Sequence, residues 1–487
     1  MKNRLQARRA GLLLHPTSLP GSRNHGDLGA GARRFVDFLA ASGFSVWQTL
    51  PLGPTHEDGS PYQCLSVHAG NPELISLDEL VASGWLDEAV ADTRACLARA
   101  RAGFENRANQ ADRDALRDFR QRHAFWIDDY ALYQAIRRVH QGAPWYNWPE
   151  PLRSRDSTAI GKFRATYEVV IEQACFEQFL FFTQWQALRD YARERGVALF
   201  GDIPIFVAHD SADVWARREL FSIDASGKLD VVSGVPPDYF SATGQRWGNP
   251  LYRWERIADE DYRWWLERFR SQLELFDIIR LDHFRGFEKY WEIAAQAETA
   301  IEGRWVEGPG TALFERLAEE FGDLPLVAED LGLITPEVEA LRTQLSLPGM
   351  KILQFAFDGS PGNPYLPHNH DPLAVVYTGT HDNDTSLGWY RGLTEAGRQV
   401  VDEYLGLPSE PMPWPLIRAA LASVAELAIL PMQDILALGS EHRMNTPGTT
   451  ADNWRWRFDW DQASEDLVAR MHHLIRIYGR AGSRAGQ

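Results

Sequence analysis

The chain has 487 residues, of which 44% are hydrophobic, so a large buried core is expected and disorder is excluded for most of it. Its net charge of −17 argues against a general role in binding nucleic acid or anionic membranes. The apolar run at residues 11–14 is too short for a signal peptide, and no stretch approaches transmembrane length. We therefore expect a cytoplasmic protein.

The first fifty residues predict a strand, a helix and a second strand. An apolar run at 11–14 is followed by a helical pattern that ends at Gly43, a good helix C-cap, and by another apolar run at 44–51. The next segment, 51–72, is a long loop rich in Gly, Pro and Ser. Tyr62 in this loop is a candidate ligand contact, although an inert ordered loop is the alternative.

Residues 78–175 are charged, Ala-rich and mostly helical in pattern, which predicts a helical insertion subdomain rather than a separate domain. A further helix then leads to the apolar strand at 197–207, which carries one acid, Asp202. Residues 208–255 are expected to be a long, irregular, loop-rich insertion. Because Gly, Pro and aromatic residues are interleaved in it, we expect this insertion to cover the active site.

The rest of the chain alternates apolar runs with helical patterns. Eight strands are predicted, near residues 11, 45, 198, 277, 325, 351, 374 and 428. Eight such strands with helical connections indicate a (β/α)₈ TIM barrel that forms a single catalytic domain over residues 1–487. Polar residues gather after the strand ends, where barrels of this kind keep their active sites.

The stretch FDIIRLDHFRG at 276–286 carries Asp282 between Arg280 and Arg285. Nearby positive charge favours an ionised carboxylate, which is the state that a nucleophile needs. A structural ion pair at the end of a strand is the alternative.

Two further acids, Glu329 and Asp382, also follow apolar strands. Carboxylates that meet at a barrel mouth suit glycoside chemistry, in which one attacks the anomeric carbon and another protonates the leaving oxygen. The acid must begin protonated, and the apolar neighbours of Glu329 are expected to raise its pKa by desolvation. A third acid can bind sugar hydroxyls and stabilise the transition state.

Several longer motifs carry a specific resemblance to a known protein family. They are SPYQ (60–63), AGNP (69–72), GDIPIFV (201–207), GVPPDYFSATGQRWGNP (234–250), RLDHFRG (280–286), VAEDLG (327–332), TGTHDND (378–384) and MQDILALGSEHRMNTPG (432–448). In these motifs the sequence resembles the 4-alpha-glucanotransferases, or amylomaltases, of the alpha-amylase clan. The resemblance implies transfer of α-1,4-glucan segments between maltooligosaccharides by a retaining mechanism, in starch, glycogen or maltodextrin metabolism, without a cofactor or a metal.

The resemblance also implies roles for individual residues. Asp282 is expected to be the nucleophile, Glu329 the general acid and base, and Asp382 the transition-state stabiliser. The residues expected to bind substrate, or to support those that do, are Tyr62, Asp202, Asp238, Tyr239, Phe240, Trp247, Asn249, Arg280, His283, His381 and Asn453. Among these, Asp202 is expected to orient a neighbouring arginine.

Two other functions remain open at this stage. A hydrolytic α-amylase uses the same covalent intermediate but resolves it with water. Tyr239 and Phe240 are expected to favour transfer by covering the cleft and stacking on the acceptor, while Asp238 binds acceptor hydroxyls. A non-catalytic glucan-binding protein is the third reading, although a binder does not need a nucleophile together with an acid. The sequence does not fix the oligomeric state.

Overall fold

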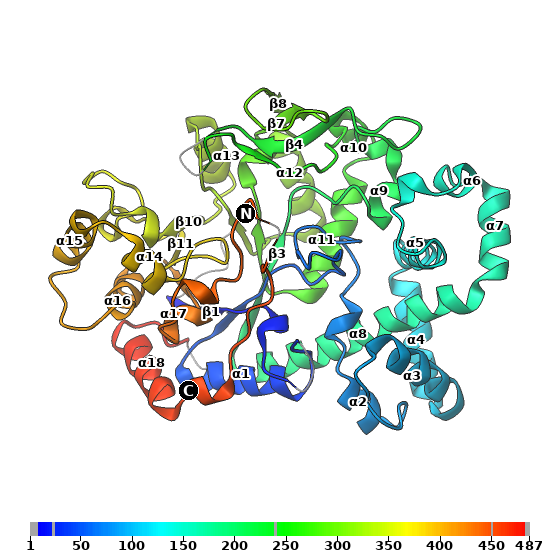
Figure 1. Cartoon of the computed structure of the whole chain (residues 1–487), viewed down its shortest axis with the longest axis horizontal. Helices are drawn as coiled ribbons and strands as arrows, with labels where there is room; N and C mark the ends of the chain where they lie inside the picture. The colour runs from blue at the N-terminus through cyan, green and yellow to red at the C-terminus, as the bar shows by residue number, and fades with distance from the viewer. Residues whose placement is uncertain (1–7, 22–24, 238–240, 450, 483–487) are drawn as a thin grey trace.

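The computed structural model describes residues 8–21, 25–237, 241–449 and 451–482. Eight parallel strands form its central sheet in the order β10-β11-β12-β1-β2-β3-β6-β9 (Figure 1). They are β1 (Arg9–Leu13), β2 (Val46–Gln48), β3 (Ala198–Ile203), β6 (Ile278–Leu281), β9 (Leu326–Ala328), β10 (Gly349–Ile352), β11 (Ala374–Tyr377) and β12 (Leu427–Pro431). Between the edge strands, Ala328 N donates to Pro348 O (2.9 Å), so the sheet closes almost completely. The predicted (β/α)₈ barrel and its eight strands are confirmed.

Alternating side chains of the strands fill the barrel interior, and the remaining ones face the helices outside. In β11, Val375 and Tyr377 belong to the inner apolar cluster, whereas Ala374 and Val376 belong to the large outer core. All four are at most 1% exposed, because both faces of a parallel barrel strand are covered. This is why the strands appear in the sequence as short continuous apolar runs.

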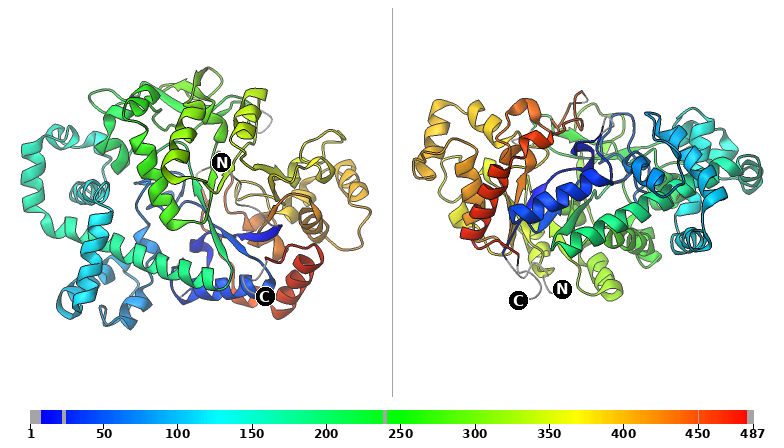
Figure 2. Two further views of the ribbon diagram at one scale, coloured as in Figure 1. Left: turned by 180° about the vertical axis from the view of Figure 1, so that it is seen from behind. Right: turned by 90° about the horizontal axis from the view of Figure 1, so that it is seen from below.

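Helices alternate with the barrel strands along the chain. They are α1 (Ala30–Ser42), α8 (Glu168–Glu194), α11 (Arg263–Leu275), α12 (Gly310–Phe321), α13 (Pro336–Gln344), α14 (Ser386–Gly392), α15 (Glu395–Tyr404), α16 (Trp414–Ala422), α17 (Met432–Ile435) and α18 (Glu465–Ile477). Gly43 ends α1 with a φ of 85°, as its predicted role as a C-cap requires. The first and last helices lie side by side, where His472 Nδ1 contacts Ala41 O at 3.1 Å (Figure 2).

Six further helices lie between β2 and α8, at the right of Figure 1. They are α2 (Leu77–Ala82), α3 (Thr93–Arg107), α4 (Gln110–Arg122), α5 (Ile127–Val139), α6 (Glu150–Arg153) and α7 (Ser157–Thr166). Residues 78–175 are therefore helical, as predicted. Their status as a subdomain of one catalytic domain stays a prediction.

The sequence does not predict a second sheet, which lies at the top of Figure 1. Its antiparallel strands are β4 (Val231–Val235), β5 (Gln245–Arg246), β7 (Lys289–Ala294) and β8 (Arg304–Glu307), in the order β5-β4-β7-β8. The 208–255 segment also contains α9 (Ala212–Ala216), and α10 (Trp254–Asp259) begins at its end, so the expectation of an irregular segment is wrong for these parts. β4 pairs with β7, a segment distant in the sequence, and Val232 and Ile293 are buried together there, while the two-residue strand β5 pairs with β4.

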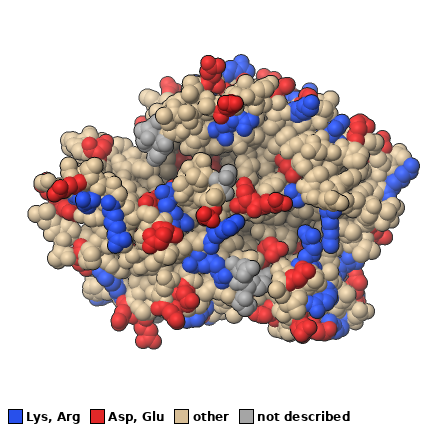
Figure 3. All heavy atoms as spheres, viewed as in Figure 1, with Lys and Arg blue, Asp and Glu red and all other residues tan. Residues whose placement is uncertain are grey.

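Charged side chains of both signs are interspersed over the face shown in Figure 3. In the part of the chain that the structure describes, no helix is long and apolar enough to span a membrane. The cellular compartment stays a prediction.

Candidate active site

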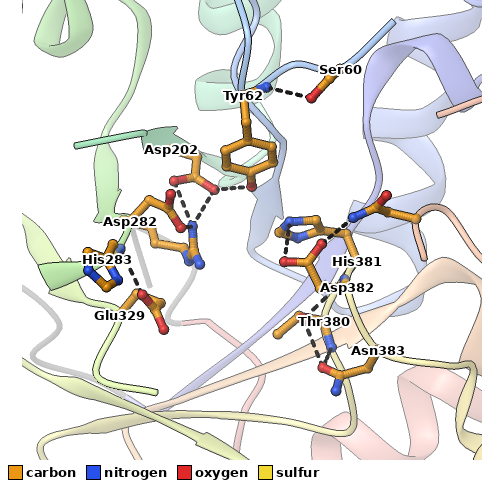
Figure 4. Close-up of polar contacts among 12 residues, drawn as sticks. Ser60, Tyr62, Asp202, Asp282, His283, Glu329, Thr380, His381, Asp382 and Asn383 are labelled. Carbon is orange, nitrogen blue, oxygen red and sulfur yellow. Dashed lines mark hydrogen bonds and ion pairs between the residues drawn. The ribbon is translucent and has the colours of Figure 1, made fainter. Parts of the chain in front are cut away.

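Three acids lie at or just beyond the carboxyl ends of barrel strands. Asp282 follows β6 directly and Glu329 follows β9 directly, while Asp382 lies five residues beyond the end of β11. Because the strands are parallel, these positions share the same mouth of the barrel (Figure 4). The prediction that the three strand ends converge is therefore supported by the topology.

Arg280 joins two of the acidic side chains in this mouth. Its Nη1 lies 2.9 and 2.8 Å from the two carboxylate oxygens of Asp202, and 2.8 Å from Asp282 Oδ1. Tyr62 Oη donates to Asp202 Oδ2 at 2.7 Å. Burial lowers the pKa of Arg280, but Asp202 and Asp282 raise it by more, so the guanidinium stays charged. Asp202 orients the arginine in the way that the sequence resemblance implies.

Burial raises the pKa of Asp282 to about 6, although Arg280 acts in the opposite direction. The carboxylate is therefore mostly ionised at neutral pH, as expected, but with a raised rather than a lowered pKa. The expectation of two flanking arginines is wrong, because Arg285 points elsewhere. Arg285 Nη1 donates to Leu333 O, and its guanidinium lies 3.8 Å from the ring centroid of Trp305.

Glu329 is 9% exposed and accepts hydrogen bonds from two backbone groups. His283 N donates to its Oε2 at 2.7 Å, and Leu331 N donates to its Oε1 at 3.1 Å. Burial, with the nearby Asp282, raises the pKa of Glu329 to about 8, although Arg280 and the His283 N–H hydrogen bond act in the opposite direction. The expected direction is confirmed, and this group holds a proton at neutral pH.

The adjacent acid, Asp330, has a separate role. Its Oδ1 accepts from Met350 N at 2.7 Å, and its Oδ2 lies 3.2 Å from Arg342 Nε. Asp330 therefore connects β9 to β10 and α13 rather than serving the barrel mouth.

Asp382 is held from two sides. His381 Nε2 lies 3.3 Å from its Oδ2, and Asn445 Nδ2 donates to its Oδ1 at 2.6 Å. Arg443 Nη2 donates to the backbone oxygen of Asp382 at 3.0 Å. Burial raises the pKa of Asp382, but His381 and the Asn445 hydrogen bond bring it well below its ordinary value. Asp382 stays a carboxylate throughout the neutral range.

Two aromatic rings connect the Asp202–Arg280–Asp282 contacts on one side of the site with Asp382 on the other. Tyr62 and His381 stack with ring centroids 5.3 Å apart and an angle of 12° between the ring planes. Trp454 packs against both, at 6.0 Å from Tyr62 and 6.1 Å from His381. Figure 4 shows Tyr62 with its hydroxyl on Asp202 and its ring beside His381.

Trp247 and His283 form a contact of their own beside the acids. Trp247 lies edge-to-face with His283, with ring centroids 4.7 Å apart. His283 is buried and has a left-handed φ of 50°. Burial, with Arg285 and Arg280, lowers the pKa of His283 to about 3, so its ring is neutral.

The two predicted asparagines use their amides within the protein. Asn249 Nδ2 donates to Val207 O at 3.0 Å, and its Oδ1 accepts from Ser233 Oγ at 3.3 Å. Asn453 Oδ1 accepts from Thr446 N, while its Nδ2 donates to Thr449 O, both at 2.9 Å. These contacts favour a role in holding the surrounding loops, and direct substrate binding by either asparagine stays a prediction.

Asp238, Tyr239 and Phe240 lie outside the described residues. Their expected role in covering the cleft and binding the acceptor stays a prediction. In the described ranges, no group of three or more His, Cys, Asp or Glu side chains is arranged to hold a metal ion.

Asn445, Arg443 and Trp454 were not singled out from the sequence. The motif at 432–448 contains two of them and is a signal that this segment belongs to the site. Their contacts with Asp382, Tyr62 and His381 depend on tertiary structure, so the spacing of the motif does not assign them individually.

Comparison with known proteins agrees with this geometry. The model of the 4-alpha-glucanotransferase family, glycoside hydrolase family 77, matches residues 14–462. The 4-alpha-glucanotransferase of Thermus thermophilus is 49% identical over 96% of this chain and 98% of its own length. The 4-alpha-glucanotransferase of Synechocystis sp. is 48% identical over 98% of this chain and 99% of its own length. Amylomaltase from Streptococcus agalactiae in complex with acarbose matches with a TM-score of 0.93 and 36% identity, over 97% of this chain and 99% of that chain.

Proposed function

The chain belongs to the 4-alpha-glucanotransferase family, and on this premise we propose that Asp282, Glu329 and Asp382 are its catalytic residues. Its reaction is the transfer of an α-1,4-glucan segment from a donor chain to an acceptor. The observation that carries the assignment is the opposite protonation of two neighbouring acids. Asp282 has a pKa of about 6 and Glu329 one of about 8, so at pH 7 the first is mostly ionised and the second mostly protonated.

These states suit the two steps of a retaining double displacement. In the first step, the Asp282 carboxylate forms a bond to the anomeric carbon, while the glycosidic bond breaks and Glu329 gives its proton to the leaving oxygen. In the second step, Glu329 takes a proton from the 4-hydroxyl of the acceptor sugar. That oxygen then displaces Asp282, so the configuration at the anomeric carbon is retained.

The remaining contacts keep the nucleophile in place. Arg280 binds Asp282 and Asp202 together, and Tyr62 anchors Asp202 from the other side. On the opposite side, Asp382 is an ionised, partly exposed carboxylate with its side chain 45% exposed. Such a group is suited to bind sugar hydroxyls and to stabilise positive charge that develops on the ring during transfer.

We propose maltooligosaccharides and other α-1,4-glucans as the substrates. Acarbose, the sugar analogue bound to the Streptococcus agalactiae amylomaltase, is expected to inhibit the reaction by occupying the barrel mouth. The relatives that match along nearly the whole chain are glucanotransferases, so the hydrolase alternative is not favoured. A role as a binding protein without activity is disfavoured on the same ground.

Incubation with pure maltotriose tests the proposal. Separation of the products by chromatography is expected to show glucose together with a ladder of longer maltooligosaccharides, and Asp282→Asn is expected to abolish both. Asp87→Asn is a suitable control, because this side chain is 84% exposed and pairs with Arg107 in the helical region. Glucose and maltose without longer products would identify a hydrolase, and transfer by Asp282→Asn would contradict the assigned nucleophile.

A further inference from the structure

Trp454 lies against the two aromatic rings that connect the halves of the active site. Its ring centroid is 6.0 Å from that of Tyr62 and 6.1 Å from that of His381. A Cβ added to Gly59, in the loop that leads to Tyr62, would lie 3.9 Å from the Cβ of Trp454. The indole therefore packs beside the Tyr62–His381 stack.

This stack is the junction of two chains of polar contacts. From Tyr62, one chain runs through Asp202 and Arg280 to the carboxylate of Asp282. From His381, the other reaches Asp382 directly. The two stacked rings therefore contact both groups of acids, Tyr62 through its hydroxyl on Asp202 and His381 through its Nε2 beside Asp382.

The backbone of Trp454 has an uncommon conformation. Its φ is 64°, in the left-handed region that bulky side chains rarely adopt, and the nearby Asp452 has a φ of 61°. The Trp454 N–H donates to Met444 O at 2.7 Å, and Met444 is buried in the inner cluster of the barrel. Strained residues persist where the surrounding structure determines them, and they concentrate at functional sites.

We propose that Trp454 is a positioning residue for glucan transfer, an inference that rests on the proposed function. Its indole keeps Tyr62 and His381 stacked, and through them it fixes the nucleophile and Asp382 relative to one another. Small displacements at a reacting centre are costly, since a shift of about 1 Å can reduce the rate by about a hundredfold. Trp454 acts without touching the reacting atoms itself.

Trp454→Leu tests the inference, with Trp456→Leu as the matched control. Trp456 belongs to the same segment and also packs on the inner cluster of the barrel, but its Nε1 donates to His442 Nδ1 at 3.2 Å, away from the stack. The expected result is a fall in kcat of about tenfold or more for Trp454→Leu. In the pH profile of kcat/KM, the fall at low pH is expected to begin at a higher pH in Trp454→Leu, because Arg280 then holds Asp282 less firmly. Trp456→Leu is expected to lose thermal stability and to keep both kinetic properties.

Trp454→Phe is expected to give an intermediate kcat and a smaller pH shift, and it decides the question if the leucine variant does not fold. A wild-type kcat and acid limb in the folded Trp454 variants would overturn the inference. Equal kinetic losses in the Trp454 and Trp456 variants would also overturn it, since general packing would then be the cause. Asp282→Asn is assayed alongside. If that variant still transfers glucan, the proposed function fails, whereas an inactive Asp282→Asn with normal Trp454 variants refutes only the positioning role.

Discussion

Arg280 Nη1 lies 2.8 Å from Asp282 Oδ1 and at hydrogen-bonding distance from both carboxylate oxygens of Asp202. One guanidinium nitrogen therefore offsets part of the burial that raises the pKa of Asp282. Asp202 in turn fixes the arginine and is itself bound by Tyr62. Besides burial, the protonation state of Asp282 therefore depends on a chain of contacts that begins at Tyr62, on a loop near the N-terminus.

Replacement of Arg280 is expected to impair catalysis strongly. Arg280→Gln removes the charge that keeps Asp282 ionised, so we expect kcat/KM to fall by about 10²–10³-fold. Because Arg280 lowers the pKa of Asp282, its loss moves the acid limb of the pH profile upward from about 6. Initial rates with maltotriose over a range of pH measure both effects. Arg285→Gln provides the comparison, and an equal loss in that variant would contradict the distinction between the two arginines.

The pH dependence of the wild-type enzyme follows from the two acids. Asp282 must be ionised, so kcat/KM rises as the pH increases through about 6, and Glu329 must be protonated, so it falls as the pH passes about 8. The two groups interact, so the fitted values belong to the pair. A profile without an alkaline limb near 8 would count against Glu329 as the acid.

Glu329 is also expected to lower the stability of the fold. Its folded-state pKa of about 8 lies above the ordinary value of 4.5, so the folded state keeps a proton that the unfolded chain releases as pH rises from 4.5 to 8. Stability is thus lost across this window. Glu329→Gln, which does not ionise, is expected to raise the free energy of unfolding at pH 8 by on the order of 1 kcal/mol or more. Chemical denaturation at pH 5 and pH 8 measures the difference, and an equal effect at both values would argue against the raised pKa.

Asn445 is expected to be important through its contact with Asp382. Asn445→Asp replaces a donor 2.6 Å from Asp382 Oδ1 with a like charge, so we expect kcat to fall by about 10–10³-fold. Asn445→Ala is expected to have a smaller effect in the same direction. Thr449→Val, which removes hydrogen bonds within the same loop to Thr446 and Asn453, is the control. If Thr449→Val and Asn445→Asp reduced kcat equally, loop disorder would be the cause.

Arg480 provides a test of stability that is separate from catalysis. It is 0% exposed and donates to the carbonyl oxygens of Arg9, Leu421, Ser423 and Ala425, at distances of 2.7–3.0 Å. These groups lie where β1 and β12 begin, at the end of the barrel opposite the acids. Stability in such barrels depends on this end, whereas activity depends on the other.

Arg480→Leu removes four buried hydrogen bonds, and Leu421 O and Ser423 O keep only the bonds that Arg8 donates to them. We expect it to lower the free energy of unfolding by about 2–4 kcal/mol and to leave the pH profile unchanged. Arg476→Leu, at an exposed position near the end of α18 and four residues before Arg480, is expected to change stability little. Thermal denaturation and the maltotriose assay measure the two properties, and a displaced acid limb in Arg480→Leu would contradict their separation.

The barrel was predictable from the sequence because its strands are covered on both faces. Val375, Val376 and Tyr377 are all fully buried, so their segment appears as an unbroken apolar run. The second sheet has no comparable signal. Its inner strand β4 pairs with β7, so that Val232 of β4 lies opposite Ile293 of β7. Neither segment indicates this pairing by its own sequence.

The three acids that we propose as catalytic were predictable because Asp282 and Glu329 directly follow strands and Asp382 lies in the turn beyond one, which places them at the barrel mouth. The side chains around them were less predictable. Arg280 and Arg285 both lie close to Asp282 in sequence, yet only Arg280, on β6 itself, points toward the carboxylate. Asn445 and Trp454 reach the site from a segment that follows the last strand. Only the folded chain brings them against Asp382 and Tyr62.

The identity of the nucleophile is tested most directly by trapping the glycosyl-enzyme. A maltotriosyl fluoride blocked at its 4-hydroxyl needs little acid assistance to react, and in Glu329→Gln the second step is slow because its base is missing. Intact mass spectrometry is expected to show one added maltotriosyl group, and peptide mapping to place it on Asp282. The Asp282→Asn, Glu329→Gln double variant is expected to remain unlabelled. Attachment to Asp382 or to another residue, or labelling of the double variant, would contradict the account.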